Sequence, residues 1–290
     1  MKKNVIVITG GAGFVGTNLI ILLLKNTKYK LISIDNYSSG LKKNHVQNKR
    51  VTYINDNTIN ISKILKNPKK INSIFHFGEF ARIYQSFIKM DECINSNSVG
   101  TNAVFNYCLK NKVKLIYSAT SATLGNKGND QNLSPYAFTK AKNLELLENL
   151  KKWFKFKYEV IYFYNVYGPH QICKGSMATV IGIFEDHYKL KKPLPVVRPG
   201  KQTRRFTHIH DTVEVCYSAW KKRLCRHYSI FHPKSYSILD VAKMFNSKVR
   251  YLPKRSGERY ASALSDMNLS NKVYKYFGKI DLKSYIKNLI

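Results

Sequence analysis

Three glycines recur at every third position directly after an apolar segment near the start of the chain. In "VIVITGGAGFVGTNL", residues 5–19, they are Gly10, Gly13 and Gly16. A loop that leads from a strand into a helix can bind a pyrophosphate only if its backbone approaches the ligand more closely than a Cβ would allow. The free N–H groups of the helix must also point at the charge. The spacing therefore predicts a strand, a phosphate-binding turn and a helix, in this order.

A carboxylate follows at the distance that a dinucleotide site requires. Asp35 stands 19 residues after Gly16, at the end of the next apolar segment, "KLISID". There it can accept hydrogen bonds from both hydroxyls of a ribose. A phosphate on that ribose would be repelled, and no arginine follows Asp35 directly, so the pattern favours NAD over NADP. An ordinary tight turn, the simpler interpretation of the glycines alone, would not need this carboxylate.

Strand and helix patterns alternate through the first half of the chain. Helical patterns, including those at 98–111 and from Pro135, separate strand patterns at 4–9, 30–35, 51–56, 72–77, 114–120 and 158–168. This rhythm requires right-handed crossovers and a parallel sheet. We predict an α/β protein in which residues 1–165 form an NAD-binding domain with a Rossmann-type, doubly wound parallel sheet.

The alternation ends after Gly168. The chain then contains a helical pattern at 177–189, a proline-rich segment at 191–200 that is predicted to be a loop, and short strands. No glycine-rich or serine-rich linker separates the two parts. We therefore predict that residues 166–290 form a smaller, mixed α/β lobe that packs on the first, exchanges some chain with it and binds the substrate.

Composition limits the possible partners. The formal net charge is +32, but the lysines are spread along the whole length, without the clustered basic face that marks a dedicated nucleic-acid partner. No apolar run reaches the roughly 18 residues that a membrane-spanning helix needs, so we expect a cytoplasmic protein. The five cysteines have no metal-type spacing. His208 and His210 in "RFTHIHD" are expected on one face of a strand, and no metal site is predicted.

A second pattern with chemical meaning is "SPYAFTK", residues 134–140. Tyr136 and Lys140 are four residues apart in a predicted helix and therefore lie on one face. A phenol with an ordinary pKa of about 10 is a poor base at neutral pH, but an adjacent ammonium stabilises its phenolate. The preceding strand ends in "YSATSATLG", whose hydroxyls can bind a substrate oxygen. A solvated Tyr and Lys pair is the simpler alternative, and the dinucleotide pattern upstream favours catalysis.

These segments resemble the extended short-chain dehydrogenase/reductase family. Within it, the chain is most similar to nucleotide-sugar epimerases and dehydratases, especially the UDP-glucose 4-epimerase-like proteins, over nearly its whole length. Besides "TGGAGFVG" and "YAFTK", the resemblance rests on "DNYSSG" (35–40), "NSVGT" (97–101), "YNVYGP" (164–169), "PGKQTRRFTHIHD" (199–211) and "KRSGE" (254–258). It implies an NAD-dependent enzyme that acts on a nucleotide-diphosphate sugar, and a homodimer.

The resemblance also implies roles for single residues. Thr120 would bind the reacting sugar oxygen, Tyr136 would act as the base, and Lys140 would bridge to the nicotinamide ribose. Asp56 and Asn57 would lie along the adenine of the cofactor, Phe77, Gly78 and Glu79 along its diphosphate and ribose, and Tyr164 by its nicotinamide. Tyr136 and Lys140 would themselves contact the cofactor. The other implied cofactor contacts are Gly10, Gly13, Phe14, Val15, Gly16, Asp35, Asn36, Ser39, Gly40 and Asn97.

The implied substrate contacts lie mainly in the second lobe. Asn165, Arg204 and Arg255 would hold the nucleotide diphosphate, because the planar fork of an arginine meets phosphate oxygens bidentately. Glu258 and Thr120 complete this set. Ordinary surface arginines are the simpler alternative for the two guanidinium groups.

The reaction that we expect is epimerisation, at C4 of a UDP-hexose, through a transient 4-keto sugar. Tyr136 would take the proton of the 4-hydroxyl. A 4,6-dehydratase is the main enzymatic alternative, but dehydratases carry an acidic residue just after the catalytic hydroxyl, where this chain has Ser121 and Ala122. A non-catalytic protein that binds NAD or a nucleotide sugar is an alternative of another class, and a nucleic-acid-binding protein is a third.

Several positions depart from the family pattern. Arg205 stands where aspartate is usual, Leu124 replaces a common tyrosine, Tyr162 replaces a common arginine, and Glu79 replaces a small residue. The segment between Gly125 and the predicted base has only ten residues and is shorter than usual. These departures are expected to affect the substrate pocket more than the cofactor site, and they leave the sugar and the nucleotide open.

Overall fold

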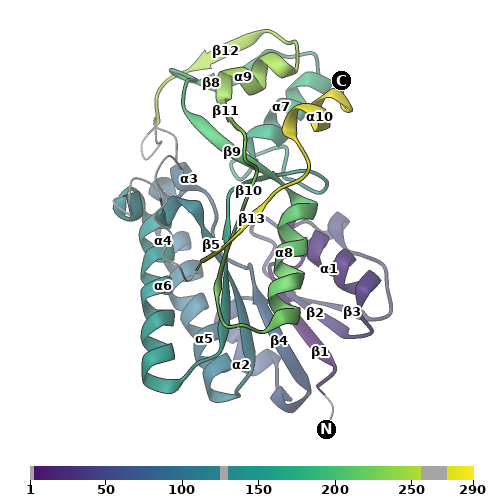
Figure 1. The fold of residues 1–290 in the computed structure, drawn as a ribbon, viewed down its shortest axis with the longest axis vertical. Coiled ribbons are helices and arrows are strands. Elements are labelled where there is room, and N and C mark those ends of the chain that lie inside the picture. The colour runs from purple at the N-terminus through teal and green to yellow at the C-terminus, as the bar shows by residue number, and fades with distance from the viewer. Residues whose placement is uncertain (1–2, 125–129, 256–272) are drawn as a thin grey trace.

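The computed structural model describes residues 3–124, 130–255 and 273–290, and its main feature is a large parallel sheet (Figure 1). The strands of this sheet are β1 (Val5–Thr9), β2 (Lys30–Asp35), β3 (Val51–Asn55), β4 (Ile71–His76), β5 (Lys114–Thr120), β6 (Tyr158–Phe163), β10 (His227–Phe231) and β13 (Val273–Phe277). They are ordered β13-β10-β6-β5-β4-β1-β2-β3, and every neighbouring pair is parallel. The order reverses at β1, so the sheet is doubly wound, and the predicted Rossmann-type α/β fold is confirmed.

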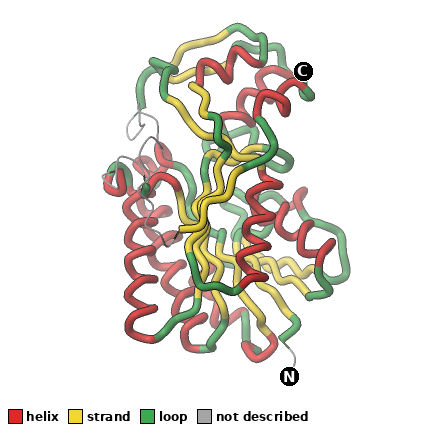
Figure 2. Tube along the Cα trace, in the orientation of Figure 1, coloured by secondary structure: helices red, strands yellow, loops and turns green. Residues whose placement is uncertain are grey.

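Helices cover both faces of the sheet, so that the strands lie between two groups of helices (Figure 2). On one face α1 (Phe14–Asn26) packs against α8 (Ile209–Lys222). The opposite side carries α2 (Ile61–Ile64), α3 (Ile83–Ile88), α4 (Met90–Ile94), α5 (Thr101–Lys110) and α6 (Pro135–Phe154). Short 3-10 turns lie at Lys42–Asn44, Thr58–Asn60, Pro68–Lys70 and Ser121–Thr123.

The apolar run of β1 explains its central place. Val5 and Val7 belong to the apolar cluster beneath α5 and α6, whereas Ile6 and Ile8 belong to the cluster beneath α1 and α8. A strand buried on both faces is apolar at successive positions rather than at alternate ones. The glycine loop that follows is thus attached to a fully buried strand that is paired on both sides.

The helix predicted over 98–111 differs from the observed one. A π-helical turn, Asn95–Gly100, continues α4 and leads directly into α5. In this wider turn the Asn97 side chain points inward, where Oδ1 accepts a hydrogen bond from the backbone N–H of Phe80 at 2.7 Å. Its Nδ2 donates to the carbonyl oxygen of the same residue at 3.0 Å. Asn97 therefore holds the loop after β4 in place.

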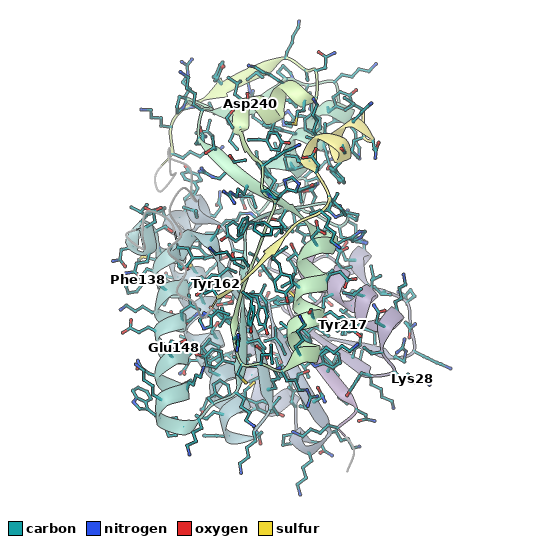
Figure 3. All side chains as sticks on the ribbon, in the orientation of Figure 1. Lys28, Phe138, Glu148, Tyr162, Tyr217 and Asp240 are labelled. Carbon is teal, nitrogen blue, oxygen red and sulfur yellow. The ribbon has the colours of Figure 1, made fainter. Side chains whose placement is uncertain are left out.

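A smaller lobe stands at the carboxyl ends of the strands, with Asp240 on its outer side (Figure 3). It contains a three-stranded sheet of β11 (Ser235–Ser237), β9 (Thr203–His208) and β7 (Asn165–Tyr167), and a parallel pair of β8 (Leu194–Val197) and β12 (Val249–Leu252). Its helices are α7 (Val180–Lys189), α9 (Ile238–Met244) and α10 (Leu282–Lys287). Between these parts the chain returns to the large sheet to supply α8, β10 and β13.

Two local predictions for this lobe are wrong. The proline-rich segment 191–200 contains β8, which pairs with β12, a partner too distant in sequence for the local pattern to reveal. The predicted strand over "RFTHIHD" ends at His208, and His210 lies in α8. His208 is the N-cap of this helix: its Nδ1 accepts a hydrogen bond from the backbone N–H of His210 at 3.2 Å.

The described residues also bear on the expectations for disulfide bonds, metal sites and membrane-spanning helices. All five cysteines are free thiols. Within residues 3–124, 130–255 and 273–290, no group of three or more His, Cys, Asp or Glu side chains could hold a metal ion. No helix in the described part of the chain combines the length and the apolar character needed to cross a membrane.

Candidate active site

A cavity of about 670 Å³ is lined by residues of both the large sheet and the smaller lobe. It lies where the parallel strands end at their carboxyl side, the usual ligand position in such sheets. Every predicted site residue that the structure describes lines this cavity, except Gly40 and Asn97. Glu258 lies outside the described residues. The cavity thus brings together side chains from most of the length of the chain.

The glycine loop forms a narrow cradle at one end of the cavity. Gly10 has a positive φ of +70°, and a Cβ on it would lie 2.8 Å from the backbone nitrogen of Gly78. A Cβ on Gly16 would collide with the carbonyl oxygen of Gly10. Gly13 is the N-cap of α1 and provides no side-chain cap, which leaves the first N–H groups of the helix available to an anion.

Asp35 lies beside this cradle at the end of β2. It is 7% exposed, and its carboxylate accepts hydrogen bonds from the backbone N–H groups of Ala12 and Tyr37, both at 2.9 Å. Burial raises the pKa of Asp35, and these N–H groups oppose the shift. Gly40 packs against the same carboxylate. A Cβ at this position would lie only 2.7 Å from Oδ1 of Asp35, so a larger residue would displace the carboxylate.

The predicted adenine residues form an exposed rim next to Asp35. The Nδ2 of Asn36 donates to Oδ1 of Asn57 at 2.7 Å. Asp56 accepts from the side chain of Asn60 at 2.8 Å, and this bond, with the backbone N–H of Asn57, lowers the pKa of its carboxyl group. These polar groups are available to a base and its ribose at the surface.

Tyr136 reaches the cavity because α6 begins immediately before it. Ser134 is the N-cap, and its hydroxyl accepts a hydrogen bond from the backbone N–H of Ala137 at 3.1 Å. Pro135 occupies the first helical position, where a missing N–H costs nothing. The backbone N–H of Tyr136 donates to Oγ of Ser86 at 3.2 Å, which joins the start of α6 to α3.

The phenol of Tyr136 is buried and close to charged groups. Burial raises its pKa to about 12, Thr120 and the Arg82 guanidinium act in the opposite direction, and Glu79 adds to the increase. The Thr120 hydroxyl lies at the end of β5 and accepts a hydrogen bond from the backbone N–H of Ala122 at 3.1 Å. Proton uptake and release by Tyr136 therefore depend on the charges around it.

Lys140 is held by a carboxylate that the sequence had not connected with it. Its Nζ contacts Oε2 of Glu79 and donates to the carbonyl oxygen of Ser118 at 2.6 Å. Both charged side chains are almost fully buried, with 4% of Lys140 and 2% of Glu79 exposed. Burial lowers the pKa of Lys140, and Glu79 opposes that shift.

The substrate residues predicted in the second lobe also reach the cavity. Arg204 follows the first residue of β9, and the Arg255 guanidinium lies 5.2 Å from the ring centroid of Tyr84. The Nδ2 of Asn165 donates to the carbonyl oxygen of Arg205 at 3.2 Å, which joins β7 to β9. Two guanidinium groups and an amide thus line the same cavity as the glycine loop.

Most departures from the family pattern do not line the cavity. The Arg205 guanidinium lies 4.7 Å from the ring centroid of Phe231, and Leu124 packs on the core of the large lobe. Tyr162 lies among the side chains of the large sheet (Figure 3), where its hydroxyl is 3.1 Å from Nδ1 of His227. Glu79 is the one departure of the four that belongs to the cavity wall.

Arg82 is a cavity residue that sequence reasoning missed. It precedes α3, and its Nε donates to the carbonyl oxygen of Met177 at 2.8 Å, while Nη1 donates to that of Ala81 at 2.7 Å. No motif surrounds it in "GEFARIYQ". The usable signal was its position a few residues after the end of β4, in the loop that begins with Phe77 and Gly78.

Comparisons with known proteins show similarity in sequence and in fold. The sequence model of the "NAD dependent epimerase/dehydratase family" matches residues 6–231. The ADP-L-glycero-D-manno-heptose-6-epimerase of Brachyspira hyodysenteriae is 29% identical over 72% of this chain and 70% of its own. The dTDP-D-glucose 4,6-dehydratase of Bos taurus is 26% identical over 82% of this chain and 71% of its own. The UDP-glucuronic acid 4-epimerase from Bacillus cereus, solved with UDP-glucuronic acid and NAD, is 25% identical, has a TM-score of 0.85 and matches over 100% of both chains.

Proposed function

Because the chain belongs to the NAD dependent epimerase/dehydratase family, within the extended short-chain dehydrogenases/reductases, we propose that it epimerises a nucleotide-diphosphate sugar at C4. A UDP-hexose is the substrate class that we infer. The observation that most supports the proposal is one cavity that holds the glycine loop, Tyr136 with Thr120, and two arginines of the smaller lobe. We retain the prediction that residues 1–165 bind the cofactor and 166–290 the sugar nucleotide.

NAD is the cofactor of this family, and the residues of the cavity fit it. The glycine cradle, which any Cβ would fill, suits a pyrophosphate, and the buried carboxylate of Asp35 suits the hydroxyls of an unphosphorylated ribose. When bound, NAD supplies reversible hydride exchange, which allows a sugar alcohol to pass through a ketone. We expect Asn36, Asp56 and Asn57 to lie along its adenine half.

The groups of the chain itself would bind the sugar and move its proton. Arg204, Arg255 and Asn165 would hold the diphosphate, so that the sugar extends toward Tyr136. The Thr120 hydroxyl would orient the reacting oxygen, and the phenolate of Tyr136 would accept its proton and later return it. Epimerisation requires only one proton-transfer group and space in which the keto sugar can turn.

A 4,6-dehydratase remains the second candidate, because a dehydratase is among the relatives of the chain. That reaction also requires a group that removes the C5 proton and protonates the departing hydroxyl. Among the described residues that line the cavity, the carboxylates are Asp35, Asp56 and Glu79. The first two lie beside the predicted adenosine site, and Glu79 is engaged by Lys140. This distribution supports the epimerase.

A product assay tests the proposal. The purified protein is incubated with NAD and a panel of neutral and acidic nucleotide sugars, and products are resolved by mass and retention. We expect a product with the mass of its substrate, inverted at C4, and no net change in NAD. A product lighter by one water would establish the dehydratase instead. Binding of NAD and a sugar nucleotide without turnover would favour the non-catalytic alternative.

The base is tested by Tyr136→Phe. We expect turnover to fall by roughly 100-fold to 10,000-fold, because the proton acceptor is lost, while NAD affinity is retained. Tyr162→Phe is a matched control, since Tyr162 is a buried tyrosine that does not line the cavity. Unchanged turnover in Tyr136→Phe would exclude this residue as the base.

We also expect a cytoplasmic homodimer, as the sequence predicted. Light scattering of the purified protein tests the oligomeric state, and fractionation of cells tests the location. A monomer at the concentration of the activity assay would contradict the first expectation.

A further inference from the structure

The ammonium of Lys140 does not face the cavity alone. Its contact with the Glu79 carboxylate forms a pair that is almost fully buried. The shared proton lies either on the nitrogen, giving an ion pair, or on the oxygen, giving a neutral pair. In both cases the two side chains together carry no net charge. The pair therefore cannot act on its surroundings as a free lysine would.

The Glu79 carboxylate is held in place by several other elements. Its Oε1 accepts hydrogen bonds from Thr101 Oγ1 on α5 and Tyr117 OH on β5, both at 3.0 Å, and from Asn143 Nδ2 on α6 at 3.3 Å. A buried polar group whose hydrogen-bonding capacity is satisfied in this way is held rigidly. Its position is therefore determined by the packing of the large lobe.

A different cation lies near the phenol. Arg82 is bonded through Nε to the carbonyl oxygen of Met177, whose side chain packs in the same small cluster as Tyr136. Among the described residues, its hydrogen bonds are formed by Nε and Nη1 and none by Nη2, and no carboxylate forms an ion pair with it. A guanidinium remains protonated at any working pH. No carboxylate in the described part of the chain thus compensates the positive charge that Arg82 presents to the cavity.

The remaining groups that face Tyr136 are neutral near physiological pH. Among the described residues they are the Thr120 hydroxyl on β5, the Ser86 hydroxyl on α3, the Tyr117 phenol on β5, whose pKa burial raises well above its ordinary value, and the Cys93 thiol on α4, whose pKa burial raises to about 11. Within residues 3–124, 130–255 and 273–290, the charged groups around the phenol are therefore Glu79, Lys140 and Arg82, of which the first two cancel.

We propose that Glu79 is a positioning residue that holds Lys140 and cancels its charge, and that Arg82 supplies the positive charge that stabilises the Tyr136 phenolate. This inference rests on the proposed function, in which Tyr136 is the base. It assigns the stabilising charge to a residue that the Tyr136 and Lys140 motif does not contain. It also predicts that the base is weaker near neutral pH than the motif alone suggests, so that turnover rises into the alkaline range.

The ionisation of Tyr136 can be measured without any sugar. The protein is labelled with 13C-tyrosine, the resonance of Tyr136 is identified by its loss in Tyr136→Phe, and its apparent pKa is determined by titration. In Glu79→Gln the Lys140 ammonium is no longer cancelled, so we expect the pKa of Tyr136 to fall by on the order of one unit. In Arg82→Gln we expect a rise of similar size.

Two further variants complete the test. The double variant Glu79→Gln/Lys140→Met removes the pair as a whole, leaves no unpaired buried charge, and should keep the pKa of Tyr136 near its parental value. Glu145→Gln is the matched control, because Glu145 is an exposed glutamate on α6 that pairs with Lys142. We expect it to cause no shift.

Opposite shifts in Glu79→Gln and Arg82→Gln, with little change in the double variant, support the proposal. Absence of the shift in Arg82→Gln, or a marked rise in the double variant, would overturn it, since Lys140 would then be the active charge. With an active nucleotide sugar, the pH profile of turnover should move in the same directions. If no sugar is turned over, the proposed function fails, and the titration still decides the charge arrangement.

Discussion

Two buried carboxylates lie at the carboxyl ends of the strands on either side of β1, and they are held in different ways. Asp35, the last residue of β2, accepts hydrogen bonds from the backbone N–H groups of Ala12 and Tyr37. Glu79, after β4, accepts from an ammonium, two hydroxyls and an amide of other elements. Backbone donors leave the charge of Asp35 available to a ligand, whereas Lys140 neutralises that of Glu79. The same functional group is thus held by neighbouring backbone groups at one strand end and by side chains of other elements at the other.

We expect the two carboxylates to differ most in their contribution to the stability of the protein. Glu79→Gln leaves the buried Lys140 ammonium without a counter-charge, so we expect the free energy of unfolding to fall by about 3–5 kcal/mol. Asp35→Asn should cost only about 1 kcal/mol, because solvent in the cavity can satisfy the backbone donors. Urea denaturation of both variants, with Glu145→Gln as the exposed control, measures the difference. Equal losses at Asp35 and Glu79 would remove the distinction between the two regions.

His76 lies between the regions of Asp35 and Glu79. We expect it to have a smaller effect on stability, and one that depends on pH. Its Nδ1 is 2.7 Å from Thr9 Oγ1 beside the glycine loop, and its Nε2 is 2.9 Å from Thr101 Oγ1, which donates to Glu79. Burial lowers the pKa of His76 to about 4 from an ordinary value of 6.5. Between these pH values the unfolded chain binds a proton that the folded protein does not. The contribution of His76 to stability is therefore fully present above pH 6.5, and roughly 3 kcal/mol of it is lost as the pH decreases to about 4.

Denaturation of His76→Gln at several pH values tests this prediction. His208, whose pKa burial also lowers to about 4, and His227, whose pKa burial lowers as well, remain in the variant, so the loss of stability on acidification should become smaller by roughly 3 kcal/mol but should not disappear. An unchanged dependence on pH would show that His76 does not link the two regions in this way.

The smallest expected effect concerns cofactor affinity. Asp35→Ala removes the acceptor for the ribose hydroxyls, so we expect NAD to bind about 10-fold to 100-fold more weakly, with a smaller loss for NADP and a narrower preference. Glu79→Gln should keep NAD affinity within a few-fold, because its carboxylate is occupied by the fold. Calorimetric titration of both cofactors measures these changes. Tighter binding of NADP than of NAD by the parent protein would contradict the role of Asp35.

The glycine cradle and the carboxylate beside it could be predicted from the sequence because these parts are short and contiguous. The three glycines, the helix that begins at Phe14 and the carboxylate at the end of the next strand all lie within residues 5–35. The N-cap Ser134 and Pro135 likewise determine where α6 starts, and so which helical turn carries Tyr136. The parallel sheet followed from the regular alternation of apolar segments.

Other features could not be predicted, because they depend on residues far apart in the chain. The strand β8 pairs with β12, and the Glu79 carboxylate meets Lys140 from 61 positions away and Asn143 from 64. Neither a strand pattern nor a helical spacing indicates which side chains will meet when α5 and α6 pack over the ends of β4 and β5. The position of Arg82 beside Tyr136 is a similar case.

The sequence by itself determined the elements whose hydrogen bonds are made within a few residues: the glycine turn, the helix caps and the buried strands. Only the tertiary structure decided the charge around the proposed base. The physical reason is that electrostatic interactions act through space and depend on burial, so the contribution of Lys140 changes completely once the buried Glu79 lies against it. The Tyr136 and Lys140 motif specified which side chains are present near the base. The packing of the fold decided whether the positive charge of Lys140 is cancelled.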